Sequence, residues 1–294
     1  MKIASATARS LAIGHATPRP SVSPLTGLAN LAVAVMHHPQ FRDREIVECL
    51  ETRVQYVDPC PDQRALERIY DEEYNAVFGR DFGTAAPAFV ERRALAQLKF
   101  LEGVPFGRVA EVGAGWGALA SLLSRTNEVE CYELDSRAVD YMRQKGLNAT
   151  LGALEHQSHE QFDLVASSMM LEHLPRPLDA LKAWRRCLSP EGHLFLEIPL
   201  ENPVPNWWGA DPARPYWVGH LTFFAKGHLD LMLHAAGFTV KKASYHDHPV
   251  SPGYVMPGDH QVYDLTQIPT SHDTQVSTAD HPKLLRLLAQ KCDY

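Results

Sequence analysis

The sequence has few of the features that mark secreted, membrane or nucleic-acid-binding proteins. Its five cysteines are scattered and form no Cys-x-x-Cys pair, which argues against a disulfide framework and against a cysteine-based zinc site. No apolar run approaches the roughly 20 residues of a transmembrane helix. Because the net charge is −7, the chain lacks the excess of Lys and Arg that a broad nucleic-acid surface needs. These absences predict a cytoplasmic globular protein that binds neither membranes nor nucleic acid.

Acidic residues are absent before Asp43, whereas Lys2, Arg9, Arg19 and Arg42 are basic. Transit peptides of organelle proteins show a similar bias. No clear apolar segment or cleavage signal accompanies it here, so we interpret the segment as an N-terminal arm or lid.

The apolar pattern of residues 1–95 predicts a mainly α-helical N-terminal extension. Leu25–His38 is apolar enough for a packed helix, whereas the periodicity of Glu45–Tyr56 does not separate helix from strand. Tyr70 and Tyr74 share one helical face as an i, i+4 pair. They either pack against the core or cover a ligand pocket, and Tyr74 is a candidate for orienting a substrate.

The most informative stretch is an apolar strand that reaches Glu111 and is followed by glycines at every second position, at Gly113, Gly115 and Gly117. Glycine tolerates positive φ and lets the backbone approach a ligand closely, and the free N–H groups of a helix start favour polar or anionic groups. The dinucleotide fingerprint is G-x-G-x-x-G, but Ala118 stands at its last glycine. A nicotinamide-dependent oxidoreductase is therefore a distant alternative.

From Arg108 onward, strand and helix patterns alternate, which predicts an α/β fold with a doubly wound, mainly parallel seven-stranded sheet. We place this core at residues 96–245, with a polar and aromatic insertion at 199–219. Residues 246–294 are expected to form a loop-rich C-terminal extension that ends in a helix over Pro282–Lys291.

The stretch from Glu111 to Gly117 resembles motif I of the class I S-adenosylmethionine-dependent methyltransferases. Two later segments extend the resemblance: Leu171-Glu172-His173 is similar to the Glu-His element after the fourth strand, and His220 to Phe238 is similar to the tail of the small-molecule subgroup. The resemblance covers roughly residues 108–245. It implies a Rossmann-like fold, S-adenosyl-L-methionine as cofactor and methyl transfer as the reaction.

The resemblance also implies which residues bind the cofactor. Glu133 stands 20 positions after Gly113, the interval expected for a carboxylate that binds ribose hydroxyls; its neighbour Asp135 is better placed as a helix N-cap. Ala153 replaces an aspartate that many relatives carry near the adenine. The predicted cofactor site consists of Glu111, Gly113, Ala114, Gly115, Trp116, Gly117, Glu133, Leu134, Gly152, Ala153, Leu154, Ser168 and Met169.

Histidines are the candidates for proton transfer, because their pKa lies near working pH. His220 is the first candidate and His173 the second, with positioning of a loop or of the cofactor pocket as the alternative role of each. Tyr74 completes the predicted catalytic set. His246 and His248 are close in sequence, but two loop histidines need further ligands, and no metal site is predicted.

The predicted reaction is methyl transfer to a small molecule of specialised metabolism, in which the protein positions the reactants and a histidine assists deprotonation. No Asn-Pro-Pro-Tyr-type motif follows the fourth strand, which argues against methylation of adenine or glutamine amino groups. Two alternatives remain, a protein or peptide acceptor and a non-catalytic cofactor-binding partner subunit. The acceptor atom and the oligomeric state stay open.

Overall fold

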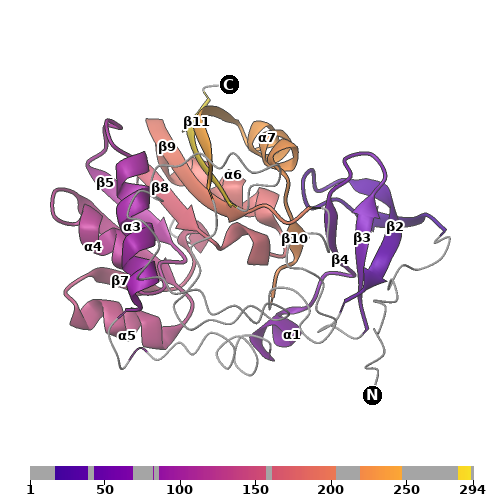
Figure 1. The fold of residues 1–294 in the computed structure, drawn as a ribbon, viewed down its shortest axis with the longest axis horizontal. Helices are drawn as coiled ribbons and strands as arrows, with labels where there is room; N and C mark the ends of the chain where they lie inside the picture. The colour runs from indigo at the N-terminus through magenta and orange to yellow at the C-terminus, as the bar shows by residue number, and fades with distance from the viewer. Residues whose placement is uncertain are drawn as a thin grey trace, which may run out of the picture.

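The computed structural model contains two β-sheets, a large one flanked by helices and a small antiparallel one beside it (Figure 1). We call them the main sheet and the N-terminal sheet. The structure describes residues 17–38, 43–68, 82, 86–156, 161–202, 219–246 and 284–292.

The main sheet has seven strands, and five of them are parallel neighbours. Across the sheet the order is β11 (Phe238–His246), β12 (Leu284–Lys291), β9 (Leu188–Pro199), β8 (Phe162–Ser168), β5 (Arg108–Val112), β6 (Glu128–Glu133) and β7 (Asn148–Leu151). In this sheet β12 runs opposite to the other six strands, because it pairs antiparallel with both β11 and β9. The prediction of a mainly parallel, seven-stranded α/β sheet is confirmed.

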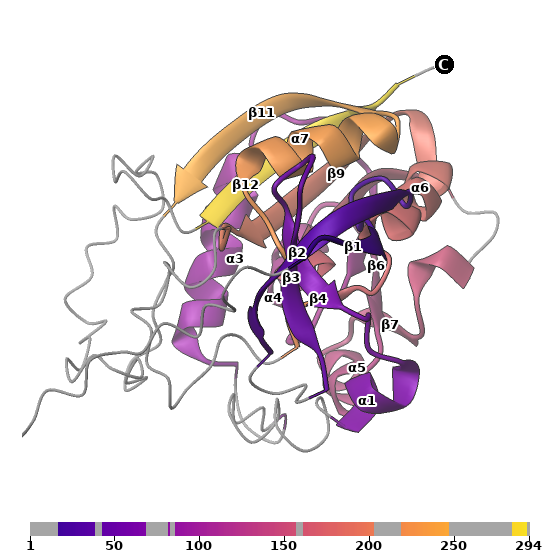
Figure 2. The ribbon, with the colours of Figure 1, turned by 90° about the vertical axis from the view of Figure 1, so that its right-hand side faces the viewer.

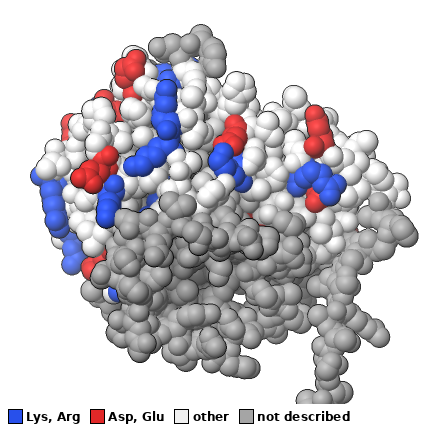
Figure 3. Space-filling model, turned by 45° about the horizontal axis from the view of Figure 1, so that its top comes forward, with Lys and Arg blue, Asp and Glu red and all other residues white. Residues whose placement is uncertain are grey.

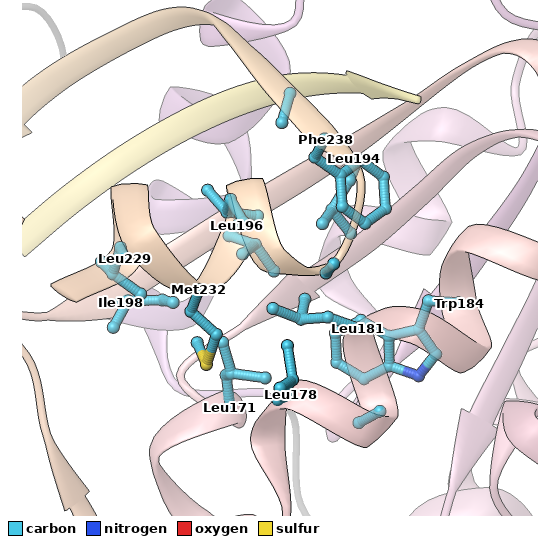
Figure 4. Close-up of a cluster of buried hydrophobic side chains, with 14 of the residues drawn as sticks. Leu171, Leu178, Leu181, Trp184, Leu194, Leu196, Ile198, Leu229, Met232 and Phe238 are labelled. Carbon is cyan, nitrogen blue, oxygen red and sulfur yellow. The ribbon is translucent and has the colours of Figure 1, made fainter. Parts of the chain in front are cut away.

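Helices cover both faces of the main sheet. Side chains of α3 (Ala88–Phe100), α4 (Ala118–Leu123) and α5 (Ser136–Gln144) join one hydrophobic cluster, and those of α6 (Pro177–Cys187) and α7 (Lys226–Ala235) join the cluster on the other face. Figure 4 shows leucines and Trp184 of α6 meeting side chains of β9 and α7. Two short 3-10 helices, η2 (Leu154–His156) and η3 (Leu171–His173), follow β7 and β8.

The helix expected over Pro282–Lys291 is wrong, because the described part of this segment, Leu284–Lys291, is strand β12. It lies between β11 and β9 (Figure 2). Leu287 belongs to the hydrophobic cluster on one face of the sheet and Leu288 to the cluster on the other. A strand buried on both faces has a continuous apolar sequence rather than an alternating one, so its pattern resembles that of a buried helix.

The mainly helical extension expected over residues 1–95 is also wrong. Its described part is mainly antiparallel sheet, built from β1 (Arg19–Val22), β2 (Ala29–His37), β3 (Glu45–Cys49) and β4 (Gln55–Asp58). Only the short helix α1 (Gln63–Arg68) and the start of α3 are helical among its described residues. The expected helix over Leu25–His38 is therefore a tight turn and a strand. Val and Ala alternate along β2, and β-branched residues favour a pleated, half-buried surface.

The fifth strand of the N-terminal sheet comes from a segment that is distant in the sequence from the other four strands. Strand β10 (Thr222–Phe223) pairs antiparallel with β4, and it lies between β4 and the helices of the main sheet (Figure 1). Just before it, the N–H of Leu221 donates to the carbonyl of Glu172 (2.8 Å), while the Leu221 carbonyl accepts from Val57 (2.9 Å). The segment around β10 therefore joins the N-terminal sheet to the edge of the main sheet.

Charges of both signs are interspersed over the described surface on the face seen in Figure 3. In the part of the chain that the structure describes, none of the helices has the length and hydropathy of a membrane-spanning segment.

Candidate functional site

The glycine turn between β5 and α4 has the conformation that its sequence predicts. Gly113, Gly115 and Gly117 have φ values of 70°, 55° and 63°, in the left-handed region that favours glycine. A Cβ at Gly113 would lie 2.7 Å from Met170 Cγ, and one at Gly117 would lie 2.7 Å from Leu147 Cδ1. A Cβ at Gly115 would have no described atom within 4 Å. The turn is thus closely packed against side chains at Gly113 and Gly117 and open at Gly115, where a ligand can approach the backbone.

Glu133, at the end of β6, reaches back to this turn. Its Oε2 accepts a hydrogen bond from the N–H of Gly115 (2.9 Å), and its Oε1 accepts from Leu134 (2.7 Å) and Asp135 (3.1 Å). Asp135 in turn caps α5 by accepting from the N–H of Arg137 (2.9 Å), which confirms its predicted structural role. The open centre of the glycine turn and the Glu133 carboxylate therefore face one region, as a ribose-binding site requires.

Glu111 supports the turn rather than exposing its charge. The side chain is buried, and its Oε2 accepts from the N–H of Ala120 in the first turn of α4 (2.7 Å). Burial raises the pKa of Glu111 to about 8, although the Ala120 hydrogen bond acts to lower it. Its carboxyl group holds the start of α4 against β5.

The other predicted cofactor residues divide into three groups. Gly152 (φ 146°) donates its N–H to the Glu133 carbonyl (2.9 Å) at the same edge of the sheet. Leu154, by contrast, is fully buried in a hydrophobic cluster, and the Trp116 ring packs edge-on against Tyr141, with centroids 5.1 Å apart. The remaining members, Ala114, Leu134, Ala153, Ser168 and Met169, lie in the turns that follow β5, β6, β7 and β8 or at the strand ends.

A buried ionic network lies beside this edge and was not predicted. Glu197 of β9 forms an ion pair with Arg286 of β12, and its Oε1 accepts from Gln97 (3.1 Å) and from Ser168 (3.2 Å). Arg93 of α3 lies 3.7 Å from the same oxygen. Burial by itself would raise the pKa of Glu197, but the two guanidinium groups outweigh it and hold the pKa below its usual value. The network ties β8, β9, β12 and α3 together.

A second polar cluster contains both predicted histidines. His173 follows β8 and His220 precedes β10, and the structure brings their rings to 4.5 Å, nearly perpendicular. Glu172 lies between them, with Oε1 3.8 Å from His220 Nε2 and 3.9 Å from His173 Nε2. Nδ1 of His220 is 2.7 Å from Glu201 Oε2. We call Glu172, His173, His220 and Glu201 the Glu-His cluster.

Burial governs the protonation of the Glu-His cluster. Glu172 is fully buried, while Glu201 and His220 are 4 % exposed. Burial lowers the pKa of His220 to about 3, so its imidazole is neutral at pH 7. It also raises the pKa values of Glu172 and Glu201 well above the usual range.

Sequence reasoning identified the two histidines but missed the roles of Glu172 and Glu201. Glu172 is adjacent to His173 in the sequence, and this adjacency is the feature from which its role could have been inferred. Glu201 has no such signal, because its partner His220 lies 19 residues away across the insertion. Tyr74 and most of the 199–219 insertion lie outside the described residues. At His246, Nε2 lies 2.6 Å from Ser244 Oγ, and His248 is also outside the described residues.

Comparisons with known proteins agree with this architecture. A family model described as "Methyltransferase domain" matches residues 86–243, more than half of the chain. A ubiquinone biosynthesis O-methyltransferase from Xanthomonas oryzae pv. oryzae is 34% identical over 107 residues, which are 33% of this chain and 45% of that protein. The chain thus spans less than half the length of such curated relatives.

Two solved structures share the fold. The N-methyltransferase NodS from Bradyrhizobium japonicum WM9, in complex with S-adenosyl-L-homocysteine, has a TM-score of 0.50 at 14% identity and covers 78% of this chain and 98% of its own. A SAM-dependent methyltransferase from Archaeoglobus fulgidus has a TM-score of 0.51 at 16% identity and covers 74% and 100%. With the family match and the strand order, these similarities show that the chain belongs to the class I S-adenosylmethionine-dependent methyltransferases.

Proposed function

We propose that this methyltransferase modifies a small-molecule acceptor of specialised metabolism, and that the acceptor binds beside the Glu-His cluster. The observation that carries the proposal is one shared edge: the open centre of the glycine turn, Glu133 and the segment Ser168–His173 all follow the carboxyl ends of parallel strands. Ligands bind at this edge in open α/β sheets. The names of the relatives add support, since one acts in ubiquinone biosynthesis.

The residues fit the cofactor of the family. The open side of Gly115 leaves room for a ligand at the backbone, and we assign Glu133 to the ribose hydroxyls. When bound, S-adenosylmethionine supplies a methyl group that is already activated by its sulfonium. The tasks left to the protein are to orient the acceptor and to exclude water.

We assign removal of the acceptor's proton to the Glu-His cluster. A neutral imidazole whose Nδ1 is oriented by a carboxyl group has the arrangement of a general base, and His220 is oriented in this way by Glu201 (2.7 Å). Burial keeps this imidazole unprotonated, as a base requires, although it also lowers its basicity. The residues before the main sheet and the 199–219 insertion are proposed to shape the acceptor side. Tyr74 remains a candidate for orienting the acceptor.

Calorimetry with S-adenosyl-L-homocysteine tests the cofactor assignment. The Glu133→Ala variant should bind about 10–100-fold more weakly, because hydrogen bonds to a charged group contribute about 1.5–3 kcal/mol. Glu128→Ala is the matched control, since Glu128 belongs to the same strand but is 69% exposed at its opposite end. Equal affinities of the two variants would contradict the role of Glu133.

Turnover with methyl-labelled donor tests the acceptor class. A cell extract is divided into small molecules and macromolecules, and each fraction is incubated with the protein. Label in the small-molecule fraction supports the proposal. Label confined to protein or peptide would overturn it, and cofactor binding without any label transfer would favour a non-catalytic partner subunit.

A further inference from the structure

Three side chains of the Glu-His cluster direct potential metal ligands at one point. One ligand atom from each of His173, His220 and Glu172, a ring nitrogen from each histidine and a carboxylate oxygen, all lie within 4.8 Å of one another. Both nitrogens are close to the same atom, Glu172 Oε1, at 3.9 Å and 3.8 Å. The three residues come from two chain segments, with His173 and His220 separated by 47 residues, and the second segment leads into β10.

Hydrogen bonds at the far side of each ring fix the orientation of the histidines. His173 Nδ1 donates to the carbonyl of Gly219 (3.1 Å), and His220 Nδ1 lies 2.7 Å from Glu201 Oε2. In a neutral histidine that donates through Nδ1, the lone pair is on Nε2. Metal-binding histidines almost always have such a carbonyl or carboxylate behind them. Both histidines thus turn the nitrogen suited to a metal toward Glu172.

The Glu172 carboxylate supplies the second, independent observation. Its side chain is fully buried, and neither of its oxygens has a hydrogen-bond partner among the described residues. A buried carboxylate without a donor is costly. The contrast with Glu197 is direct. Glu197 has Arg286 and Gln97 as donors, whereas the described close contacts of the Glu172 and Glu201 carboxyl groups are with histidine nitrogens, and Arg93 acts on Glu172 as a nearby charge.

We propose that Glu172, His173 and His220 bind a divalent transition metal ion, with Zn²⁺ as the reference ion. Two imidazoles and one carboxylate suit Zn²⁺, Fe²⁺ or Co²⁺, whereas Mg²⁺ and Ca²⁺ require mainly oxygen ligands. Glu201 and the Gly219 carbonyl are the outer groups that hold the two rings. Bonds of about 2.0–2.2 Å at tetrahedral angles place ligand atoms about 3.4 Å apart, so side-chain rotations that bring the three atoms together from at most 4.8 Å close the site.

Three protein ligands leave a coordination position open, as in catalytic rather than structural zinc sites. Water or an oxygen atom of a bound acceptor would occupy it, and this last assignment rests on the proposed function. In the metal-bound state, His220 acts as a ligand and does not itself take a proton.

Metal binding is measured on the full chain after treatment with a chelator and dialysis into metal-free buffer. We expect calorimetry and elemental analysis to give about one Zn²⁺ per chain, with no comparable uptake of Mg²⁺. Co²⁺ should give visible absorption bands characteristic of a four- or five-coordinate site. Failure of the unmodified protein to retain Zn²⁺, or Co²⁺ bands typical of hexa-aqua Co²⁺, would overturn the proposal without any variant.

Variants then identify the ligands. Glu172→Gln and His220→Gln should lose Zn²⁺ binding, and Glu201→Gln should weaken it by about 10–100-fold, the range for outer groups. His234→Gln is the control, because His234 is exposed in the last turn of α7 and is not a member of the cluster. Equal Zn²⁺ affinity of Glu172→Gln and His234→Gln would refute the site.

Calorimetry with S-adenosyl-L-homocysteine separates this proposal from the proposed function. Metal binding without cofactor binding would leave the site intact and overturn the methyl-transfer assignment. If cofactor binding and turnover survive complete removal of metal and the protein takes up no Zn²⁺, the metal site would be overturned and the methyl-transfer assignment would stand.

Discussion

Glu197 shows how a single residue can hold four elements of the fold together. It is fully buried, and its carboxylate is paired with Arg286 of β12 and faces Arg93 of α3. A buried ion pair contributes little compared with an apolar pair of the same shape, but loss of one partner leaves an uncompensated buried charge. The energetic importance of Glu197 therefore lies in what its removal would leave behind.

We predict that Glu197→Gln lowers the free energy of unfolding by about 3–5 kcal/mol at pH 7. Because the pKa of Glu197 is lowered in the folded state, its stabilising contribution is present above the unfolded carboxyl's pKa of about 4.3 and is lost as pH falls through the lower folded value. The difference in free energy of unfolding between wild type and variant should thus become smaller below about pH 4.3. Urea unfolding from pH 7 to pH 3 measures both effects.

A double-mutant cycle is the control for this pair. Arg286→Met alone should also destabilise, and the double variant Glu197→Gln/Arg286→Met should lose much less than the sum of the two singles. Strictly additive losses would show that the two side chains are not energetically coupled.

Residue-level prediction from the sequence was confirmed where the role is local. Asp135 was assigned as a helix cap from its position after a strand, and the hydrogen bond from Arg137 confirms it; the ribose-binding role of Glu133 stays a prediction. Glu197 could not be assigned in this way, because its partner Arg286 is 89 residues away. Sequence distance hides such pairs, and only the strand order reveals them.

At the scale of an element, the glycine turn divides its three glycines by function. Gly117 meets Leu147 and Met142 from below, so its lack of a Cβ serves packing. Gly115 has open space at the same position, so its lack of a Cβ serves ligand approach. The two positions have similar φ values, 63° and 55°, which makes them a matched pair.

We predict opposite profiles for Gly117→Ala and Gly115→Ala. Left-handed φ costs each variant about 1–2 kcal/mol, and the contact at Gly117 adds about 1–3 kcal/mol, so Gly117→Ala should be the less stable protein. Gly115→Ala should instead show the larger loss of affinity for S-adenosyl-L-homocysteine. Thermal unfolding and calorimetry of both proteins give the comparison, and unchanged cofactor affinity of Gly115→Ala would contradict the open-side assignment.

Elements were predictable where pattern and environment agree. Strands β5, β6, β8 and β9 were recognised because helices alternate with them in the sequence. β12 was mistaken for a helix because burial on both faces removes the two-residue alternation. β2 was mistaken for a helix and the segment of β3 and β4 was left open for a related reason, since short apolar segments such as residues 29–37 satisfy helix and strand patterns alike.

At the scale of the whole molecule, two neighbouring phenylalanines of one segment belong to different hydrophobic clusters, and one of these clusters is shared by the two sheets. Phe224 belongs to the large hydrophobic cluster that includes residues of both sheets. Phe223, in β10, belongs to a separate cluster with Ile46 and Val57 on the other side of the N-terminal sheet. Both rings are almost completely buried. Local opening of the N-terminal sheet and unfolding of the entire protein can therefore be separated by adjacent substitutions.

We predict that Phe223→Ala and Phe224→Ala each lower the free energy of unfolding by about 3–5 kcal/mol. The two variants should differ in which part of the protein is destabilised. Hydrogen exchange followed by mass spectrometry should show faster exchange of β2–β4 amides in Phe223→Ala, with β5 and β8 unchanged, because only the smaller cluster is opened. Phe224→Ala should accelerate exchange in both sheets. The same protection pattern in both variants would mean that the clusters act as one cooperative unit.

The outcome also concerns the site, since His220 lies in the segment that leads into β10. If the N-terminal sheet opens alone, the Glu-His cluster loses its support while the glycine turn keeps its geometry, and cofactor binding should outlast metal binding in Phe223→Ala.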